Sequence, residues 1–221
     1  MTGQQHLDEP TNFLYPFIDG NERDSGALLA DLATSASLKA AESAALRRST
    51  LQSCSALVES AGAEMARRFA TGGRLFTFGN GGSSTDAATL AALFAQPPAS
   101  EPLPAWSLTA DQAVLTALGN DVGFDLVFAR QLIARAQAAD IAIAMSTSGN
   151  SADLLLAMRE AHGRGLYTIG FTGYDGGAFV QNSDVDVCFV VRSQSVHRIQ
   201  ESQALLGYQL WSAVHMQRGL Q

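Results

Sequence analysis

The fold of this chain is decided by the stretch LFTFGNGGSS, residues 75–84, in which a short apolar run leads straight into a loop of glycine, asparagine and serine. The stretch IAIAMSTSGNS, residues 141–151, has the same plan, and a helix-like segment follows each loop. Glycine lets backbone N–H groups approach an anion closely, and serine and threonine hydroxyls add further donors. Two such loops at neighbouring strand ends would form a cup for one phosphate monoester, so we expect a phosphorylated small-molecule ligand.

Short apolar runs recur through the last two thirds of the chain. They are continuous rather than alternating, which is typical of parallel strands buried on both faces, and their connections leave room for crossover helices. The expected fold is therefore α/β, a three-layer αβα sandwich with a five-stranded parallel sheet, preceded by N-terminal helices. If the strand order is 2-1-3-4-5, the two loops lie where the order reverses, which is where open parallel sheets bind ligands. The expected strands are residues 75–78, 105–108, 141–145, 167–171 and 185–191.

We expect an N-terminal arm, residues 1–24, and a single domain, residues 25–221, that includes an N-terminal helical segment. The arm carries several aromatic residues, which a disordered tail rarely does, so we expect it to dock on the domain or on another subunit. Residues 25–71 predict two helices, or one long helix with a break near Thr50, and residues 199–218 predict a closing helix. Helices ahead of a sheet often pair between subunits, which favours an oligomer; the alternative is that they only cover their own sheet.

Composition restricts the classes of partner. The 221 residues carry a net charge of -7 without a basic cluster, which argues against nucleic-acid binding. No apolar run approaches the roughly 20 residues of a membrane span, and residues 1–6 lack the pattern of a signal peptide, so we expect a cytoplasmic protein. Cys54 and Cys188 are isolated and indicate neither a disulfide nor a metal site. Lys39 is the only lysine, so the loops lack the lysine of a nucleotide-triphosphate site.

The two loops offer specific donors to a phosphate. Ser83, Ser146, Ser148 and Ser151 would donate hydroxyl hydrogen bonds, and Thr147 a backbone N–H. The helices that follow would add free N–H groups and partial positive charge. The alternative is that these are ordinary strand-to-helix turns in which serine caps a helix. Two loops of this composition at comparable strand ends favour phosphate binding over that alternative.

Five motifs in order carry a resemblance to a known family: GNGGS at 79–83, GND at 119–121, STSGNS at 146–151, TGYDGG at 172–177 and RIQE at 198–201. Together they resemble the sugar isomerase (SIS) domain family, in particular its phosphoheptose isomerase branch. The resemblance implies a flavodoxin-like fold, a homotetramer with sites at subunit interfaces, and a bound heptose phosphate or related ketose phosphate. It also implies a set of phosphate- and sugar-binding residues, of which Asp121 and Gln200 lie close to the ligand and the others hold it. The set is Asn80, Gly81, Gly82, Ser83, Asp121, Ser146, Thr147, Ser148, Ser151 and Gln200.

The isomerase reaction of this family moves a proton between C1 and C2 of sedoheptulose 7-phosphate through an enediol, which requires a general acid and a general base. The resemblance implies a glutamate and a histidine for these roles, and zinc ligands in some members. Here the glutamate position is Leu93, the catalytic histidine position is Tyr208, and a zinc-binding histidine position is Thr89. With Gln200, these residues do not form a zinc site, so we expect neither metal nor cofactor.

The catalytic residues are therefore unknown from the sequence. His197, which stands where the family has an aspartate, and Glu201 are candidates, and Asp86 is a further carboxylate near the first loop. For each of them a structural role at a helix end or an interface is the alternative. Three functions stay open: an isomerase with an altered catalytic pair, a non-catalytic regulator that senses a sugar phosphate, and a non-catalytic subunit that partners an active paralogue.

Overall fold

The computed structural model describes residues 25–219. The chain divides into two compact units that meet between Glu42 and Ser43. The described part of the first unit is helical and belongs to α1 (Ser25–Ala70), and the second unit holds the sheet and all later helices. The predicted arm, residues 1–24, lies outside the described residues. Its docking, and the domain boundaries we expect, stay predictions.

The sheet of the second unit has five parallel strands in the order β2-β1-β3-β4-β5, which confirms the predicted α/β fold and strand order. Side chains of β3 alternate between its two faces: Ile143 and Met145 enter one core, and Ala142 and Ala144 enter the other. All four are almost completely buried, which explains why the run is apolar throughout. The strands are β1 (Leu75–Gly79), β2 (Ala105–Ser107), β3 (Ile141–Met145), β4 (Tyr167–Gly173) and β5 (Val187–Val191).

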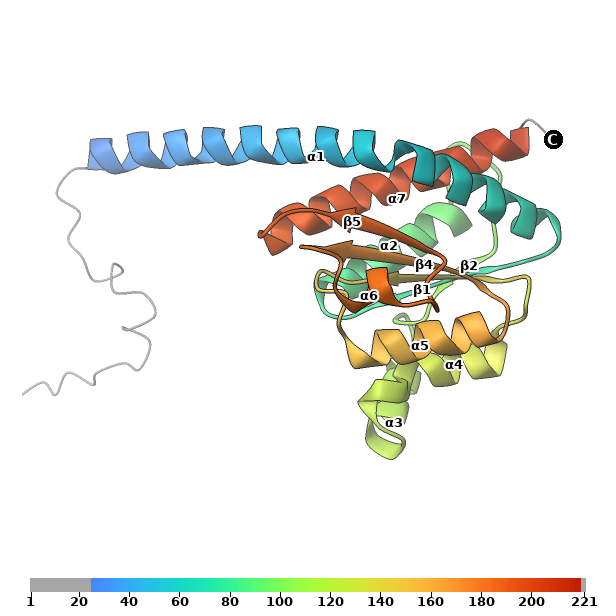
Figure 1. Ribbon diagram of the computed structural model, residues 1–221. Helices are drawn as coiled ribbons and strands as arrows, with labels where there is room; N and C mark the ends of the chain where they lie inside the picture. The colour runs from blue at the N-terminus through green and yellow to red at the C-terminus, as the bar shows by residue number, and fades with distance from the viewer. Residues whose placement is uncertain (1–24, 220–221) are drawn as a thin grey trace, which may run out of the picture. The chain divides into compact units, whose positions relative to one another are not determined.

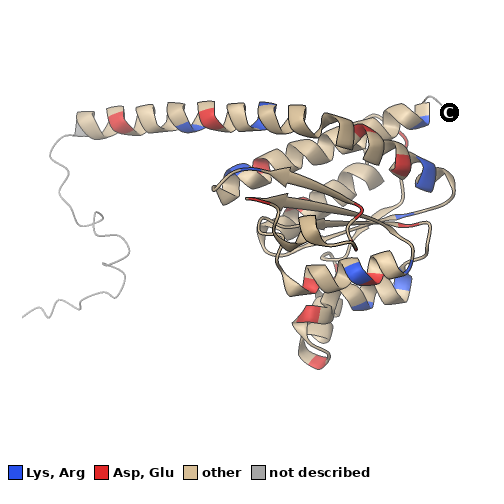
Figure 2. Ribbon diagram, viewed as in Figure 1, with Lys and Arg blue, Asp and Glu red and all other residues tan. Residues whose placement is uncertain are grey.

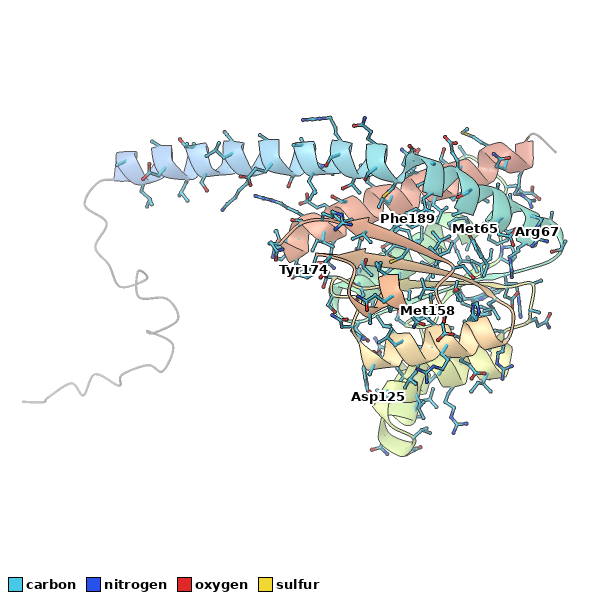
Figure 3. The ribbon with its side chains drawn as sticks, viewed as in Figure 1. Met65, Arg67, Asp125, Met158, Tyr174 and Phe189 are labelled. Atoms are coloured by element: carbon cyan, nitrogen blue, oxygen red, sulfur yellow. The ribbon has the colours of Figure 1, made fainter. Side chains whose placement is uncertain are left out.

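Helices cover both faces of this sheet and complete the sandwich (Figure 1). The end of α1 packs with α2 and α7 on one face, where Met65 and Phe189 are fully buried. Helices α4 and α5 cover the other face, where Met158 is fully buried (Figure 3). The remaining helical elements are α2 (Gly82–Ala95), α3 (Gln112–Asp121), η1 (Phe124–Leu126), α4 (Val127–Arg135), α5 (Ala152–Gly163), α6 (Gly177–Gln181) and α7 (Val196–Gly219).

The helical predictions hold with one correction. Helix α1 continues through Thr50, so the break expected there is absent. The Thr50 side chain is buried and its carbonyl accepts a hydrogen bond from the Ser53 hydroxyl, an arrangement that a helix tolerates. The closing helix predicted over 199–218 is α7.

No helix in the described part of the chain combines the length and the apolarity that crossing a bilayer requires. Helix α5 carries both acidic and basic residues, whereas the charged residues of α4 are arginines (Figure 2).

A buried carboxylate secures the end of the sheet where the strands begin. Asp140, which is 1% exposed, accepts hydrogen bonds from the backbone N–H, Nε and a terminal nitrogen of Arg74 at 2.8, 3.2 and 2.8 Å. The backbone N–H of Gln137 donates a further bond at 2.8 Å. Arg68 of α1 donates to three backbone carbonyls of the loops before β3 and β4 at 2.9 to 3.0 Å. The two Gly/Ser loops lie at the opposite end of the sheet, away from these contacts.

Candidate functional site

The two Gly/Ser loops are adjacent because the strands that carry them are adjacent. Gly79, the last residue of β1, pairs with Met145, the last residue of β3. The chain passes from Gly79 to α2 and from Met145 to α5 within a few residues. Strand order reverses at this pair, because β2 lies beyond β1 and β4 lies beyond β3. The loops therefore meet at the position where parallel open sheets hold their ligands.

A cavity of about 100 Å³ opens between these loops, and we call it the loop cavity. Six of the predicted ligand residues line it together with two apolar side chains. Its lining carries no charged side chain, so hydroxyl and N–H groups dominate its polarity. The lining residues are Asn80, Ser83, Met145, Ser146, Thr147, Ser148, Ser151 and Leu154. Their role in binding stays a prediction.

The helix N-termini beside the loop cavity are not capped by side chains. Gly81 is the N-cap of α2 and has a positive φ of 54°, which favours glycine and leaves no side chain to bond the first turn. Ser151 is the N-cap of α5, yet its hydroxyl makes no capping bond. This geometry weighs against serine acting only as a helix cap, because the Ser151 hydroxyl and the first N–H groups of both helices remain available to an anion.

The TGYDGG segment shapes the second loop from behind. The Gly173 N–H donates to the Thr147 carbonyl at 2.8 Å, and the Ala178 N–H donates to Asn150 Oδ1 at 2.8 Å. Gly149 has a φ of 67°, and a side chain on it would overlap the carbonyl oxygen of Gly176. The close backbone contact explains why residue 149 is a glycine. The same contact holds the loop in one conformation.

Asn80 is fixed by a buried carboxylate that sequence reasoning missed. Its Nδ2 donates to both oxygens of Asp153 at 3.1 and 2.9 Å, and Asp153 is 3% exposed. Asp153 lies in the first turn of α5, where a carboxylate also suits the helix dipole. Because Nδ2 of Asn80 is engaged by Asp153, its Oδ1 is the atom that could accept a hydrogen bond from a ligand. The sequence signal was only an aspartate two residues after Ser151.

A second cavity of about 60 Å³ lies between α2 and α7, and we call it the helix cavity. It shares Met145 with the loop cavity, so the two are adjacent. Leu93 and Tyr208, the positions where the resemblance implies the catalytic glutamate and histidine, both line it. The helix cavity is thus the place where proton-transfer groups would be expected. The lining residues are Asp86, Thr89, Leu90, Leu93, Met145, Gln203, Ala204, Gly207 and Tyr208.

Asp86 is the carboxylate of the helix cavity, and Gln200 holds it. Gln200 Nε2 donates to Asp86 Oδ2 at 3.1 Å. The same nitrogen lies 2.5 Å from where a Cβ on Gly82 would be, so Gln200 packs directly against the first loop. Partial burial raises the pKa of Asp86, and the hydrogen bond from Gln200 opposes that rise. The predicted proximity of Gln200 to the loop is therefore seen in the structure.

Gln203 connects the two cavities. Its Nε2 donates to the Ser146 carbonyl at 2.7 Å, which ties the amide to the second Gly/Ser loop. The side chain is fully buried, and its Oε1 has no hydrogen-bond partner among residues 25–219. An acceptor of this kind is costly to leave unpaired, by about 1–3 kcal/mol, so it is a natural receptor for a ligand hydroxyl. No sequence signal points to Gln203, because its role depends on how α7 packs.

Six predicted residues line neither cavity: Gly81, Gly82 and Gln200, which lie at the first loop or pack against it, and Asp121, His197 and Glu201. Asp121, at the end of α3, is exposed and its carboxylate accepts a hydrogen bond from Asn120 Nδ2 at 2.7 Å. His197 and Glu201, in the first turns of α7, are exposed. Within one chain the structure does not bring these last three side chains to the ligand loops, so their roles stay predictions that require a second subunit.

The residues present do not fit the zinc site of metal-dependent relatives. The corresponding positions supply the hydroxyl of Thr89, the alkyl chain of Leu93, the amide of Gln200 and the phenol of Tyr208, whereas zinc prefers imidazole, thiolate and carboxylate ligands. Within the described part of the chain, no three His, Cys, Asp or Glu side chains are grouped as metal ligands would be. We therefore derive no step of a reaction through a metal.

Comparison with known proteins places this geometry in context. The model of the SIS domain family matches residues 40–173. The phosphoheptose isomerase of Solidesulfovibrio magneticus is 42% identical over 175 residues, which are 78% of this chain and 84% of that protein. The phosphoheptose isomerase of Roseiflexus sp. is 41% identical over 158 residues, which are 71% of this chain and 79% of that protein.

Solved structures agree with the sequence relatives. The phosphoheptose isomerase from Neisseria gonorrhoeae superposes with a TM-score of 0.77 at 33% identity, covering 83% of this chain and 98% of that one. The phosphoheptose isomerase from Francisella tularensis gives a TM-score of 0.78 at 29% identity with the same coverage of both chains. Almost the whole of each solved chain thus has a counterpart here.

Proposed function

Because this chain belongs to the SIS domain family, in its phosphoheptose isomerase branch, we propose that the loop cavity binds the phosphate of a heptose phosphate or a related ketose phosphate. The observation that carries this proposal is the pair of helix N-termini, on α2 and α5, that meet at one cavity without side-chain caps. Together with the hydroxyls around them, they supply the donors that a phosphate requires. The absence of a charged side chain from the cavity lining suits a monoester held by N–H and O–H groups.

The sugar would extend from the loop cavity into the helix cavity. The two share Met145, and Gln203 and Asp86 present polar atoms on the far side of it. The reaction that fits such a ligand is ketose–aldose isomerisation, for which sedoheptulose 7-phosphate is the proposed substrate. The resemblance places Leu93 and Tyr208 at the positions of the catalytic glutamate and histidine; Leu93 cannot transfer a proton, and a tyrosine is ordinarily a much weaker acid than a histidine, so we propose that the usual acid–base pair is replaced.

We further propose the assembly and context that the family suggests. The chain would form a homotetramer, or an oligomer that includes a paralogue, in the cytoplasm, and residues 25–221 would act as one domain behind the arm of residues 1–24. If Asp121 or His197 contributes to a site, a neighbouring subunit would have to complete that site, because neither side chain lines a cavity of the single chain. Light scattering on the purified protein tests this; a monodisperse monomer would contradict it.

Thermal stabilisation by sedoheptulose 7-phosphate tests the binding proposal. Ser148→Ala removes a hydroxyl from the cavity lining, and we expect ligand affinity to fall roughly tenfold to a hundredfold, the equivalent of one charge-assisted hydrogen bond of about 1.5–3 kcal/mol. Ser60→Ala on the exposed face of α1 is the matched control and should bind like the wild type. Full stabilisation of the Ser148→Ala protein would refute the placement of the phosphate, and inorganic phosphate should compete with the sugar phosphate.

A further inference from the structure

We propose that Asp86 is the catalytic residue that carries the proton between C1 and C2 of the sugar phosphate, a role that rests on the proposed function above. Asp86 lies on α2, the helix that begins at the first Gly/Ser loop, and lines the helix cavity. It is the only carboxylate in that lining. The residue is therefore placed beside the part of the ligand that extends past Met145 from the phosphate.

The surroundings of Asp86 suit a general base. Leu90, Leu93 and Met145 line the same cavity and remove water from one side of the carboxylate. Burial raises the pKa of Asp86 from its usual range, and a carboxylate with a raised pKa is a stronger base toward carbon acids. Gln200 Nε2 bonds one oxygen, Oδ2, and fixes the orientation of the group, while Oδ1 has no hydrogen-bond partner among residues 25–219.

Gln203 supplies the second, independent indication that a polar ligand enters this cavity. Its Oε1 is an unpartnered acceptor on a fully buried side chain, and its Nε2 is already committed to the Ser146 carbonyl. A sugar hydroxyl that donated to Oε1 would satisfy that acceptor. The same hydroxyl bond would hold the sugar between the phosphate loop and Asp86. The bond to Ser146 accounts for Nε2 of this amide, and Oε1 is the atom left for the sugar.

The step can be written with all atoms and electrons in balance. Asp86 takes one hydrogen of C1 as a proton, the C–H electron pair becomes the C1=C2 bond, and the C2 carbonyl oxygen takes a proton from water to complete the enediol. The C1 hydroxyl then returns a proton to water and becomes the aldehyde, while C2 takes the proton back from Asp86. Water reaches the cavity beside Tyr208, which is 48% exposed. The reaction requires no oxidant or reductant.

Hydrogen exchange in deuterium oxide tests this proposal directly. A proton held by Asp86 exchanges with solvent, so the wild-type protein should wash deuterium into C1 of sedoheptulose 7-phosphate, measured by proton NMR or mass spectrometry. Asp86→Asn keeps an oxygen that accepts the Gln200 bond but removes the base, and we expect exchange to fall by about 100-fold or more. Ligand-induced thermal stabilisation should persist, because the phosphate contacts are unchanged. A purely structural role for Asp86 predicts that the isosteric variant keeps its exchange rate.

The controls separate this inference from the binding proposal. Asp125→Asn makes the same chemical change at an exposed residue of η1 and should exchange like the wild type (Figure 3). A wild-type protein that sedoheptulose 7-phosphate does not stabilise would refute the binding proposal. A wild-type protein that is stabilised but exchanges no deuterium would refute only the role of Asp86. Retained exchange in Asp86→Asn, or its loss in His197→Asn or Glu201→Gln instead, would also overturn it.

Discussion

Replacing Gly82 with alanine should disturb the chemistry of Asp86 while leaving the fold intact. Gly82 is the first residue of α2 and does not have a left-handed backbone conformation, so alanine is compatible with its φ. The new Cβ would lie 2.5 Å from Gln200 Nε2, which is closer than real contacts allow. The amide is the end of a flexible side chain, so Gln200 should rotate away, and its hydrogen bond to Asp86 should break.

Two opposing effects set the change in the free energy of unfolding of Gly82→Ala. Gly→Ala at a compatible site stabilises a protein by about 0.4–1 kcal/mol because it restricts the unfolded chain. Loss of a hydrogen bond to a charged group costs about 1.5–3 kcal/mol when the group is buried. Asp86 and Gln200 are only partly buried, so water replaces much of that bond. The net loss should be no more than about 1 kcal/mol, which lowers the Tm of a domain of this size by about 2–4 °C.

The same substitution should also change the protonation of Asp86. Burial raises the pKa of Asp86 and the Gln200 hydrogen bond lowers it, so removal of that bond should raise the pKa further. Because the base must be ionised, the acid limb of the deuterium exchange rate should move to higher pH in Gly82→Ala. Tyr208, the other titratable side chain of the helix cavity, is common to both proteins.

Exchange rates across pH and thermal melts of the wild type and Gly82→Ala provide the measurement. Gly163→Ala near the end of α5 is the matched control, because a Cβ at that position would have no atom within 4 Å of it. A superimposable acid limb in Gly82→Ala, or a shift to lower pH, would refute the coupling between Gln200 and Asp86. A fall in Tm of more than about 10 °C would show that the side chain of Gln200 cannot rotate out of the way.

Three further outcomes follow from the structure. Asp140→Ala removes a carboxylate with four hydrogen bonds, so urea unfolding should show a loss of about 3–5 kcal/mol, and a loss below 1 kcal/mol would contradict the role of that buried contact. Gly149→Ala places a side chain against Gly176 at a positive φ, so it should cost about 1–2 kcal/mol and reduce stabilisation by sedoheptulose 7-phosphate in thermal melts. Asp86→Asn should raise the Tm at pH 7. The pKa of Asp86 is higher in the folded chain than in the unfolded chain, so the wild type loses stability as the pH rises from about 3.8 through the folded pKa, and the asparagine variant does not. An unchanged Tm would contradict this reasoning.

The sheet could be predicted because its signals are local. Residues 141–145 form a strand buried on both faces, so the whole run is apolar and stands out from its surroundings. The position of the two loops at one reversal point depended on the strand order 2-1-3-4-5, and the sheet has that order. The continuity of α1 through Thr50 could not be predicted, because a polar residue at that position reads as a boundary. Only its burial in the folded chain shows otherwise.

The lining of the loop cavity could be predicted where its residues belong to a motif, and their role in binding stays a prediction. Ser83 and Ser148 lie in Gly/Ser loops, and the composition of these loops predicts hydroxyl and N–H donors for an anion. Asp153 and Gln203 act through partners 73 and 57 residues away in sequence, so their roles depend on the packing of α5 and α7. Asp121 is the opposite case: it belongs to a motif yet lies outside both cavities of a single chain, and its role stays a prediction. Sequence alone cannot show which subunit such a residue serves.

Met145 gives the site a property that its polar residues do not. It is the last residue of β3, is 1% exposed, and forms a wall of both cavities. The spacing between the phosphate and the carbon beside Asp86 is therefore set by the end of a buried strand, which cannot stretch or shorten as a loop would. Under the proposed binding mode, the site would discriminate ligands by length: a shorter phosphorylated ketose would fill the loop cavity, leave its carbonyl short of Asp86, and behave as an inhibitor instead of a substrate.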